Sequence, residues 1–180
     1  KENEYFSDGV AEEILNALAQ VRDLKVAGRT SSFYFKGRNE PLSTIGTALG
    51  VAHVLEGSVR KQGERLRITA QLIRVSDGFH LWSETFDGND ADIFALQDEI
   101  SEAIVTALKL KLLPEEKKAI EQRGTTNLDA YNLYLMARHH YTSGMLSDVR
   151  KNDTVIRLCR GAIELDADYA QAWALLAATQ

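Results

Sequence analysis

The chain has 180 residues, enough for one compact domain or two small ones. Hydrophobic residues make up 44% and charged residues 26%, a globular composition that excludes a disordered or collagen-like chain. The balance of 26 acidic against 21 basic residues, a net charge of −5, argues against a module that binds duplex nucleic acid, because such modules carry a basic surface.

The first predicted element is an amphipathic helix. Asp8 is the expected N-cap, and Glu12 lies in the first turn, where the helix dipole favours negative charge. The apolar stripe of this helix has helical spacing and consists of Val10, Ile14, Leu15 and Leu18.

Two short elements are expected before residue 51. Residues 24–27 predict a buried strand, followed by a polar loop and an aromatic run over residues 33–35. A helix over residues 41–49 is indicated by Pro41 near its start and Gly50 past its end. Gly46 inside that helix costs about 1 kcal/mol against alanine, which predicts close packing against a neighbour.

From residue 51 to 87 the apolar period changes to two, which predicts three strands in an antiparallel meander with turns at Gly63 and Gly78. In the third strand, Phe79 and Leu81 are expected on one face, and His80 and Trp82 on the other. A long amphipathic helix follows and is expected to end before Pro114. Its predicted inward stripe consists of Ile93, Leu96, Ile100, Ile104, Ala107 and Leu108.

The charged segment over residues 114–126 is the best candidate for a domain boundary. Helices are expected after it, at about residues 128–141, 154–165 and from 169 onward. This part of the chain resembles tetratricopeptide repeats. The spacing of that family is matched by Ala162 and by the run from Ala170 to Ala177, which includes Trp173 and Leu176. The first repeat unit is six residues longer than the usual repeat pattern, which predicts an extended turn around residues 143–153.

The amino-terminal part carries six ordered blocks: EYFSDG from Glu4, AGRTSSF from Ala27, LEGSVR from Leu55, RITAQL from Arg67, HLWSE from His80 and DIFALQD from Asp92. Together they resemble the TolB-like domain that precedes tetratricopeptide repeats in bacterial signalling proteins. The resemblance implies an α/β fold, a mixed sheet flanked by helices, followed by an all-α repeat segment. It also implies one more strand before Lys1, either cut away or supplied by something else. Such modules follow class III adenylate cyclase domains or winged-helix DNA-binding domains, often after a membrane span, and no catalytic residue is ascribed to the module itself.

The expected organisation is therefore a TolB-like domain over residues 1–113 with its first strand missing, a linker over 114–126, and the start of a truncated repeat array over 127–180. The chain is read as a piece of a longer protein. Its single cysteine, Cys159, excludes an internal disulfide, and no apolar stretch approaches the roughly 18 residues of a membrane span.

No residue pattern indicates catalysis, a cofactor or a metal. His139 and His140 point about 100° apart on a helix and do not share a metal face. The acidic cluster after Asp87 lacks the glycine that a calcium-binding loop needs for its tight turn. Class III cyclase chemistry requires two metal-binding carboxylates on a sheet, and the sequence pattern does not predict such a pair. A loop with Arg29, Thr30 and Ser31 is a candidate anion site, although it lacks the second glycine and the lysine of a P-loop.

Binding remains. Repeat arrays bind partners in a groove lined by their first helices, and the register places Tyr131, Tyr134, Arg138 and Tyr141 there. The alternative is that this face packs on the preceding domain or on a connecting helix. A polar sheet face with Arg67, Thr69 and Gln71 is the second candidate.

We therefore expect a non-catalytic sensor or scaffold region of a bacterial signalling protein that contacts protein partners. A second expectation is dimerisation through the apolar face near Trp173 and Leu176. One alternative is the regulatory part of a class III adenylate cyclase, and another is a domain that senses a nucleotide through the Arg29 loop. Either a cytoplasmic or an extracytoplasmic location agrees with the sequence.

Overall fold

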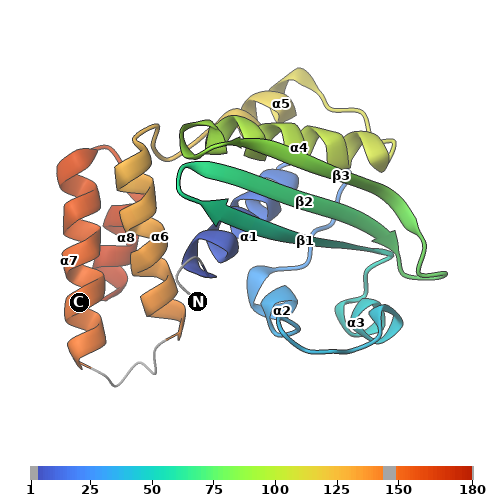
Figure 1. Cartoon of the computed structure of the whole chain (residues 1–180), viewed down its shortest axis with the longest axis horizontal. Helices are drawn as coiled ribbons and strands as arrows, with labels where there is room; N and C mark the ends of the chain where they lie inside the picture. The colour runs from blue at the N-terminus through green and yellow to red at the C-terminus, as the bar shows by residue number, and fades with distance from the viewer. Residues whose placement is uncertain (1–3, 144–148, 180) are drawn as a thin grey trace. The chain divides into compact units, whose positions relative to one another are not determined.

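The computed structural model describes residues 4–143 and 149–179 (Figure 1). The chain divides into two compact units. One unit comprises Ala11–Glu121, and the other comprises Lys1–Val10 together with Gln122–Gln180. The first unit contains the sheet and the second is helical. The expected order, a sheet followed by a helical segment, is therefore present.

The sheet of the first unit is an antiparallel meander in the order β1-β2-β3, which confirms the predicted topology. Its strands are β1 (His53–Gln62), β2 (Arg65–Arg74) and β3 (His80–Asn89). Gly63 in the first turn has a φ of 60°, a left-handed conformation that glycine adopts without a steric penalty. Two-residue turns of this kind join antiparallel neighbours directly.

The core of this unit lies between β2 and α4 (Ile93–Ala107), which packs along β2 and β3. Alternate residues of β2 point to this side and are buried: Leu66, Ile68, Ala70 and Leu72. The helix contributes most of the stripe expected of it, with Ile93, Leu96, Ile100 and Ile104 buried. Burying each such side chain contributes about 1.5–3 kcal/mol, so this layer is the main stabilising element of the unit.

The strand predicted at residues 24–27 is wrong. These residues have no regular secondary structure and pair with none of the described strands. The sheet is therefore antiparallel rather than mixed over the described residues. Hydrophobicity alone marks a buried segment, whereas a strand also needs a partner.

The alternation predicted for the third strand is interrupted near its start. Trp82 lies opposite Leu72 and Phe86 opposite Ile68, on the buried side of β2, and the register shifts only between Leu72 and Ile73. Phe79 lies outside β3 in the turn and is 71% exposed. Because side chains alternate along a strand, one irregular residue changes the facing only of the residues beyond it.

The helices before the sheet agree only in part with the prediction. Helix α1 spans Glu4–Leu18, so Asp8 lies inside it and is not the N-cap. The five-residue helix α2 (Arg29–Phe33) replaces the predicted loop. Helix α3 (Leu42–Leu49) agrees with the prediction and ends at Gly50, whose φ is 65°.

Gly46 of α3 makes the close contact that was predicted. A Cβ at this position would lie 2.4 Å from Cγ1 of Val75, which leaves no space for a side chain. After α4, much of the predicted linker is helical, because α5 spans Pro114–Glu121 and buries Ile120. An acidic first turn favours this short helix through the helix dipole.

The helical unit contains α6 (Leu128–Ser143), α7 (Val149–Leu165) and α8 (Ala170–Ala178). Its core cluster comprises Ala137, Val155, Cys159 and Leu176, so the apolar face expected near Leu176 is partly internal. Trp173 remains 51% exposed. The extended turn predicted around residues 143–153 falls partly on residues 144–148, outside the described residues. No helix within residues 4–143 and 149–179 combines the length and apolarity that crossing a membrane requires.

Candidate functional site

The four residues predicted to line a groove belong to α6 of the helical unit. This helix begins after Asn127, whose Oδ1 accepts a hydrogen bond from the backbone N–H of Ala130 at 3.0 Å. Such a side-chain cap satisfies a backbone donor that the first turn leaves unpaired. The cap sets where the helix begins and therefore which side chains share each face.

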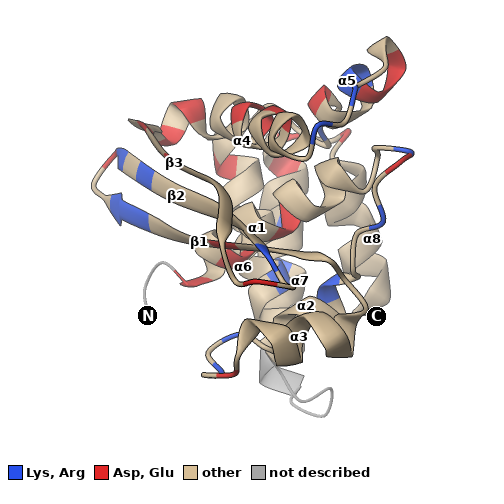
Figure 2. Ribbon diagram, turned by 90° about the vertical axis from the view of Figure 1, so that its right-hand side faces the viewer, with Lys and Arg blue, Asp and Glu red and all other residues tan. Residues whose placement is uncertain are grey.

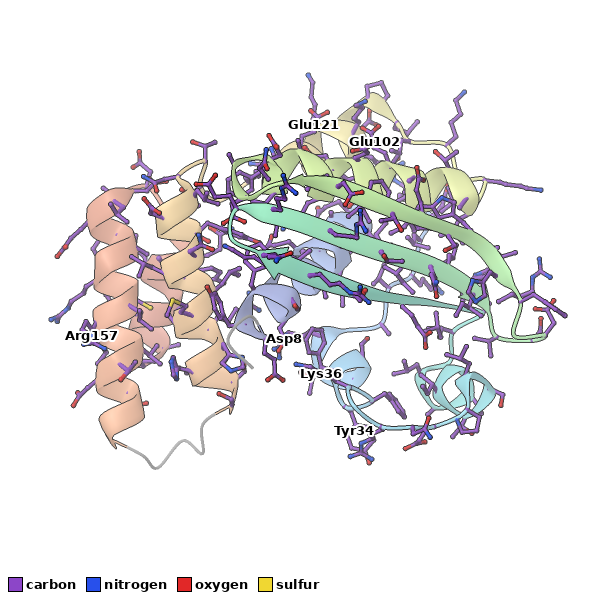
Figure 3. All side chains as sticks on the ribbon, viewed as in Figure 1. Asp8, Tyr34, Lys36, Glu102, Glu121 and Arg157 are labelled. Atoms are coloured by element: carbon purple, nitrogen blue, oxygen red, sulfur yellow. The ribbon has the colours of Figure 1, made fainter. Side chains whose placement is uncertain are left out.

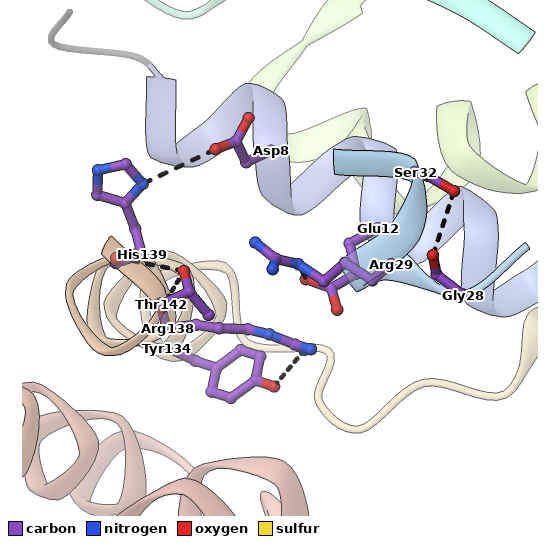
Figure 4. A network of polar contacts seen from close by, with 9 residues as sticks. All are labelled: Asp8, Glu12, Gly28, Arg29, Ser32, Tyr134, Arg138, His139 and Thr142. Atoms are coloured by element: carbon purple, nitrogen blue, oxygen red, sulfur yellow. Dashed lines mark hydrogen bonds and ion pairs between the residues drawn. The ribbon is translucent and has the colours of Figure 1, made fainter. Parts of the chain in front are cut away.

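Tyr134 and Arg138 form the centre of the candidate site (Figure 4). They lie one turn apart, and Nη1 of Arg138 donates a hydrogen bond to Oη of Tyr134 at 2.8 Å. The Tyr134 ring packs on Tyr169, with ring centroids 5.1 Å apart, and is only 5% exposed. The tyrosine therefore positions Arg138, while little of its own ring is available to a partner.

The face of α6 that carries Tyr131 is covered by the amino-terminal part of α1. A Cβ on Gly9 would lie 2.5 Å from Cδ2 of Leu135, which shows how closely the two helices approach. One turn further along α6, Nδ1 of His139 lies 3.9 Å from a carboxylate oxygen of Asp8 (Figure 4). Tyr131 precedes Leu135 by one turn and is 4% exposed.

Tyr141 lies elsewhere and is half-buried against the core cluster between α6 and α7. The four predicted residues therefore do not line one open face. Two of their rings are covered, one contributes to the core, and Arg138 keeps a partly exposed guanidinium. This arrangement favours the alternative stated above, in which the chain's own helices occupy this surface.

The candidate anion loop is organised around a buried carboxylate. Nε of Arg29 donates to Oε2 of Glu12 at 2.9 Å (Figure 4). The Arg29 guanidinium also lies 4.4 Å from the centre of the Phe33 ring. Glu12 is buried, so Arg29 compensates a charge that is costly to remove from water. Thr30 and Ser31 are exposed, but the basic residue expected to attract an anion already has an acidic partner.

The polar sheet face has internal partners as well. The guanidinium of Arg67 contacts the Asp87 carboxylate with two hydrogen bonds, at 2.6 and 3.0 Å. These bonds raise the pKa of Arg67 and lower the pKa of Asp87. Thr69 bonds with Thr85 across the strands at 3.3 Å, and Gln71 is half-buried beside them. The face is exposed, polar and close to neutral.

Sequence reasoning did not anticipate a second buried carboxylate, Glu116. Its two oxygens accept backbone N–H groups of Leu113 and Arg22, each at 2.8 Å. These bonds, with that of Leu113 the largest influence, lower the pKa of Glu116. The acidic first turn of α5 signals the cap to Leu113, but no local pattern signals the contact with Arg22, which is 94 residues away.

The described part of the chain contains other titratable groups, among them one thiol. In residues 4–143 and 149–179, no three His, Cys, Asp or Glu side chains are grouped so that they could hold a metal ion. Cys159 is buried, and desolvation raises the pKa of its thiol to about 11. Charged side chains are distributed over both units rather than gathered on one face (Figures 2 and 3).

Comparisons with known proteins place this chain beside one part of a longer bacterial protein. It is 39% identical over 176 residues to the Rhizobium meliloti protein named "Putative adenylate cyclase 3". The match covers 97% of this chain but only 29% of that relative, so the chain spans less than a third of the relative's length. No family model matches the chain.

Proposed function

We propose that this chain is a non-catalytic regulatory and scaffold region of a bacterial signalling protein related to adenylate cyclases, with the catalytic domain elsewhere in that protein. The observation that carries the proposal is the match of nearly the whole chain to 29% of the Rhizobium meliloti relative. More than two thirds of that relative remain for a catalytic domain. Within this chain, the carboxylates of Glu12, Asp87 and Glu116 have structural partners, because each pairs with a basic side chain or with backbone amides.

The proposal includes the two domain types that the sequence resembles. A TolB-like domain over residues 1–113 agrees with a sheet flanked by helices, and a linker follows over residues 114–126. A tetratricopeptide segment over residues 127–180 is supported by fully buried small residues, Ala137, Ala162 and Ala172, which permit close helix contacts. We assign the contacts with protein partners to this helical segment, where Arg138 and Trp173 present exposed surface.

The proposal is tested by assaying the purified chain for cyclic AMP formation from ATP with Mg²⁺ or Mn²⁺. The Rhizobium meliloti relative is the control in the same buffer. We expect no product from the chain alone, at a concentration at which the folded state is verified by circular dichroism. Saturable cyclic AMP formation by the chain would contradict the proposal.

The nucleotide-sensing alternative requires a separate measurement. Calorimetric titration with ATP and cyclic AMP is expected to give no saturable heat, because the guanidinium of Arg29 already donates a hydrogen bond to Glu12. An Arg29→Ala variant is the matched control. Binding by the natural chain that this variant loses would restore the anion loop as a functional site.

A further inference from the structure

The outer edge of β1 is the feature that the proposed function leaves unused. In the described part of the chain, β1 pairs only with β2, so one side of a ten-residue strand faces away from the sheet (Figure 1). It contains no proline, and its register with β2 has no bulge. Natural proteins protect long edge strands or pair them with another strand.

The register identifies the backbone groups that face this edge. Gln62 and Arg65 flank the two-residue turn, and turns of this kind join their flanking residues by a hydrogen bond. Hydrogen-bonded pairs alternate along an antiparallel ladder, so the even-numbered residues of β1 bond with β2. The N–H and C=O groups of Leu55, Gly57 and Val59 therefore point outward.

The side chains of β1 indicate that its inner face is incompletely covered. Leu55 lies opposite the buried Leu72 but is itself 38% exposed, and Val59 lies opposite the buried Ile68 but is only half-buried. The apolar layer under β2 thus thins toward β1. A further strand at this edge would extend the layer and cover both side chains.

We propose that a second copy of this chain occupies the edge, by antiparallel pairing of the two β1 strands about Ser58. In this register Glu56 of each copy lies opposite Arg60 of the other, on the exposed face of the sheet. Both side chains are exposed in the single chain, and two symmetric opposite-charge pairs then form. On the inner face, Val59 lies opposite Gly57, and Leu55 lies opposite the aliphatic stem of Lys61.

Such pairing is isologous, as a two-fold dimer requires, because the same residues meet from both sides. It joins two three-stranded sheets into one six-stranded sheet and satisfies the outward N–H and C=O groups. Lysine and arginine residues of β1 and β2 lie near the turn that joins these strands (Figure 2). Antiparallel pairing places the turns of the two copies at opposite ends of the paired strands. The inference concerns assembly and does not rest on the proposed function.

Sedimentation velocity over a wide range of protein concentration tests the proposal. We expect a dimer that Val59→Pro abolishes, because proline removes an outward N–H and leaves the bonds to β2 intact. Val59→Thr is the matched control, since it keeps the N–H and the β-branched shape. A chain that is monomeric at every concentration, or a dimer that Val59→Pro leaves unchanged, would overturn the proposal.

Charge reversal tests the register even where the proline variant fails to fold. Glu56→Arg and Arg60→Glu are each expected to weaken dimerisation about tenfold, because each places like charges opposite each other twice. The double variant should recover the natural affinity, and a mixture of the two single variants should form a heterodimer. Equal affinities for all four proteins would refute the register. If the amides of Leu55, Gly57 and Val59 exchange slowly in a monomer, another segment occupies the edge and the proposal fails.

Discussion

Single residues in this chain connect distant segments through polar contacts that no local pattern reveals. Glu12 bonds with Arg29, Asp8 lies beside His139, and Glu116 bonds with the backbone of Arg22. The sequence shows which residues are charged, but only the folded structure shows which residues they contact. The candidate site shows the same limit: the type and helical spacing of Tyr134 and Arg138 were predictable, whereas the cover provided by Tyr169 and α1 was not.

Glu116 gives the chain a defined sensitivity to acid. Its pKa is lowered in the folded protein relative to the ordinary value of 4.5, so its carboxylate stabilises the folded state above that pH. This contribution is lost as the pH falls from about 4.5 through the lowered pKa. Glu116→Gln should therefore reduce the free energy of unfolding at neutral pH, and the difference from the natural chain should disappear in acid.

Urea unfolding of both proteins at several pH values checks this prediction. Glu115→Gln, in the same turn of α5 but exposed, is the matched control and should have little effect. A difference between the Glu116→Gln variant and the natural chain that stays constant down to the lowest pH would show that the charge of Glu116 is not responsible.

At the scale of elements, the sequence pattern predicted those segments whose apolar period is long and regular. The three strands, α4 and the three helices after residue 127 follow from such periods, and the small residue Gly46 indicated its own close contact. The failures are short segments. Residues 24–27 form no strand, and a register shift interrupts the alternation near the start of β3, which depends on pairing rather than on local sequence.

The contact between α1 and α6 provides a test at this scale. Gly9→Ala adds a methyl group that would lie 2.5 Å from Cδ2 of the buried Leu135. The better helix propensity of alanine contributes about 1 kcal/mol, whereas overpacking costs about 1–3 kcal/mol. We expect a net loss of stability, measured by chemical unfolding followed by circular dichroism.

A double-mutant cycle separates the clash from other effects. Leu135→Ala alone should destabilise the chain by leaving a cavity, and Gly9→Ala should be less harmful in that background, because the methyl group then has space. Strictly additive effects would mean that the two residues do not meet in the folded protein.

At the scale of the whole molecule, the chain comprises a sheet-containing unit and a helical unit, and its similarity to the Rhizobium meliloti relative extends over almost all of both. The resemblance to TolB-like and tetratricopeptide sequences predicts the same order of units. The chain spans less than a third of the length of that relative. We propose that this region regulates chemistry performed elsewhere in a longer protein.

The most direct test uses that relative. We would delete its matching region, replace it in a second protein with this 180-residue chain, and measure cyclic AMP formation by all three. We predict that the deletion retains cyclic AMP formation but changes its basal rate or its response to the cell lysate, and that the replacement restores the original behaviour. Complete loss of cyclic AMP formation in a folded deletion protein, or identical activity of all three proteins, would contradict a regulatory role.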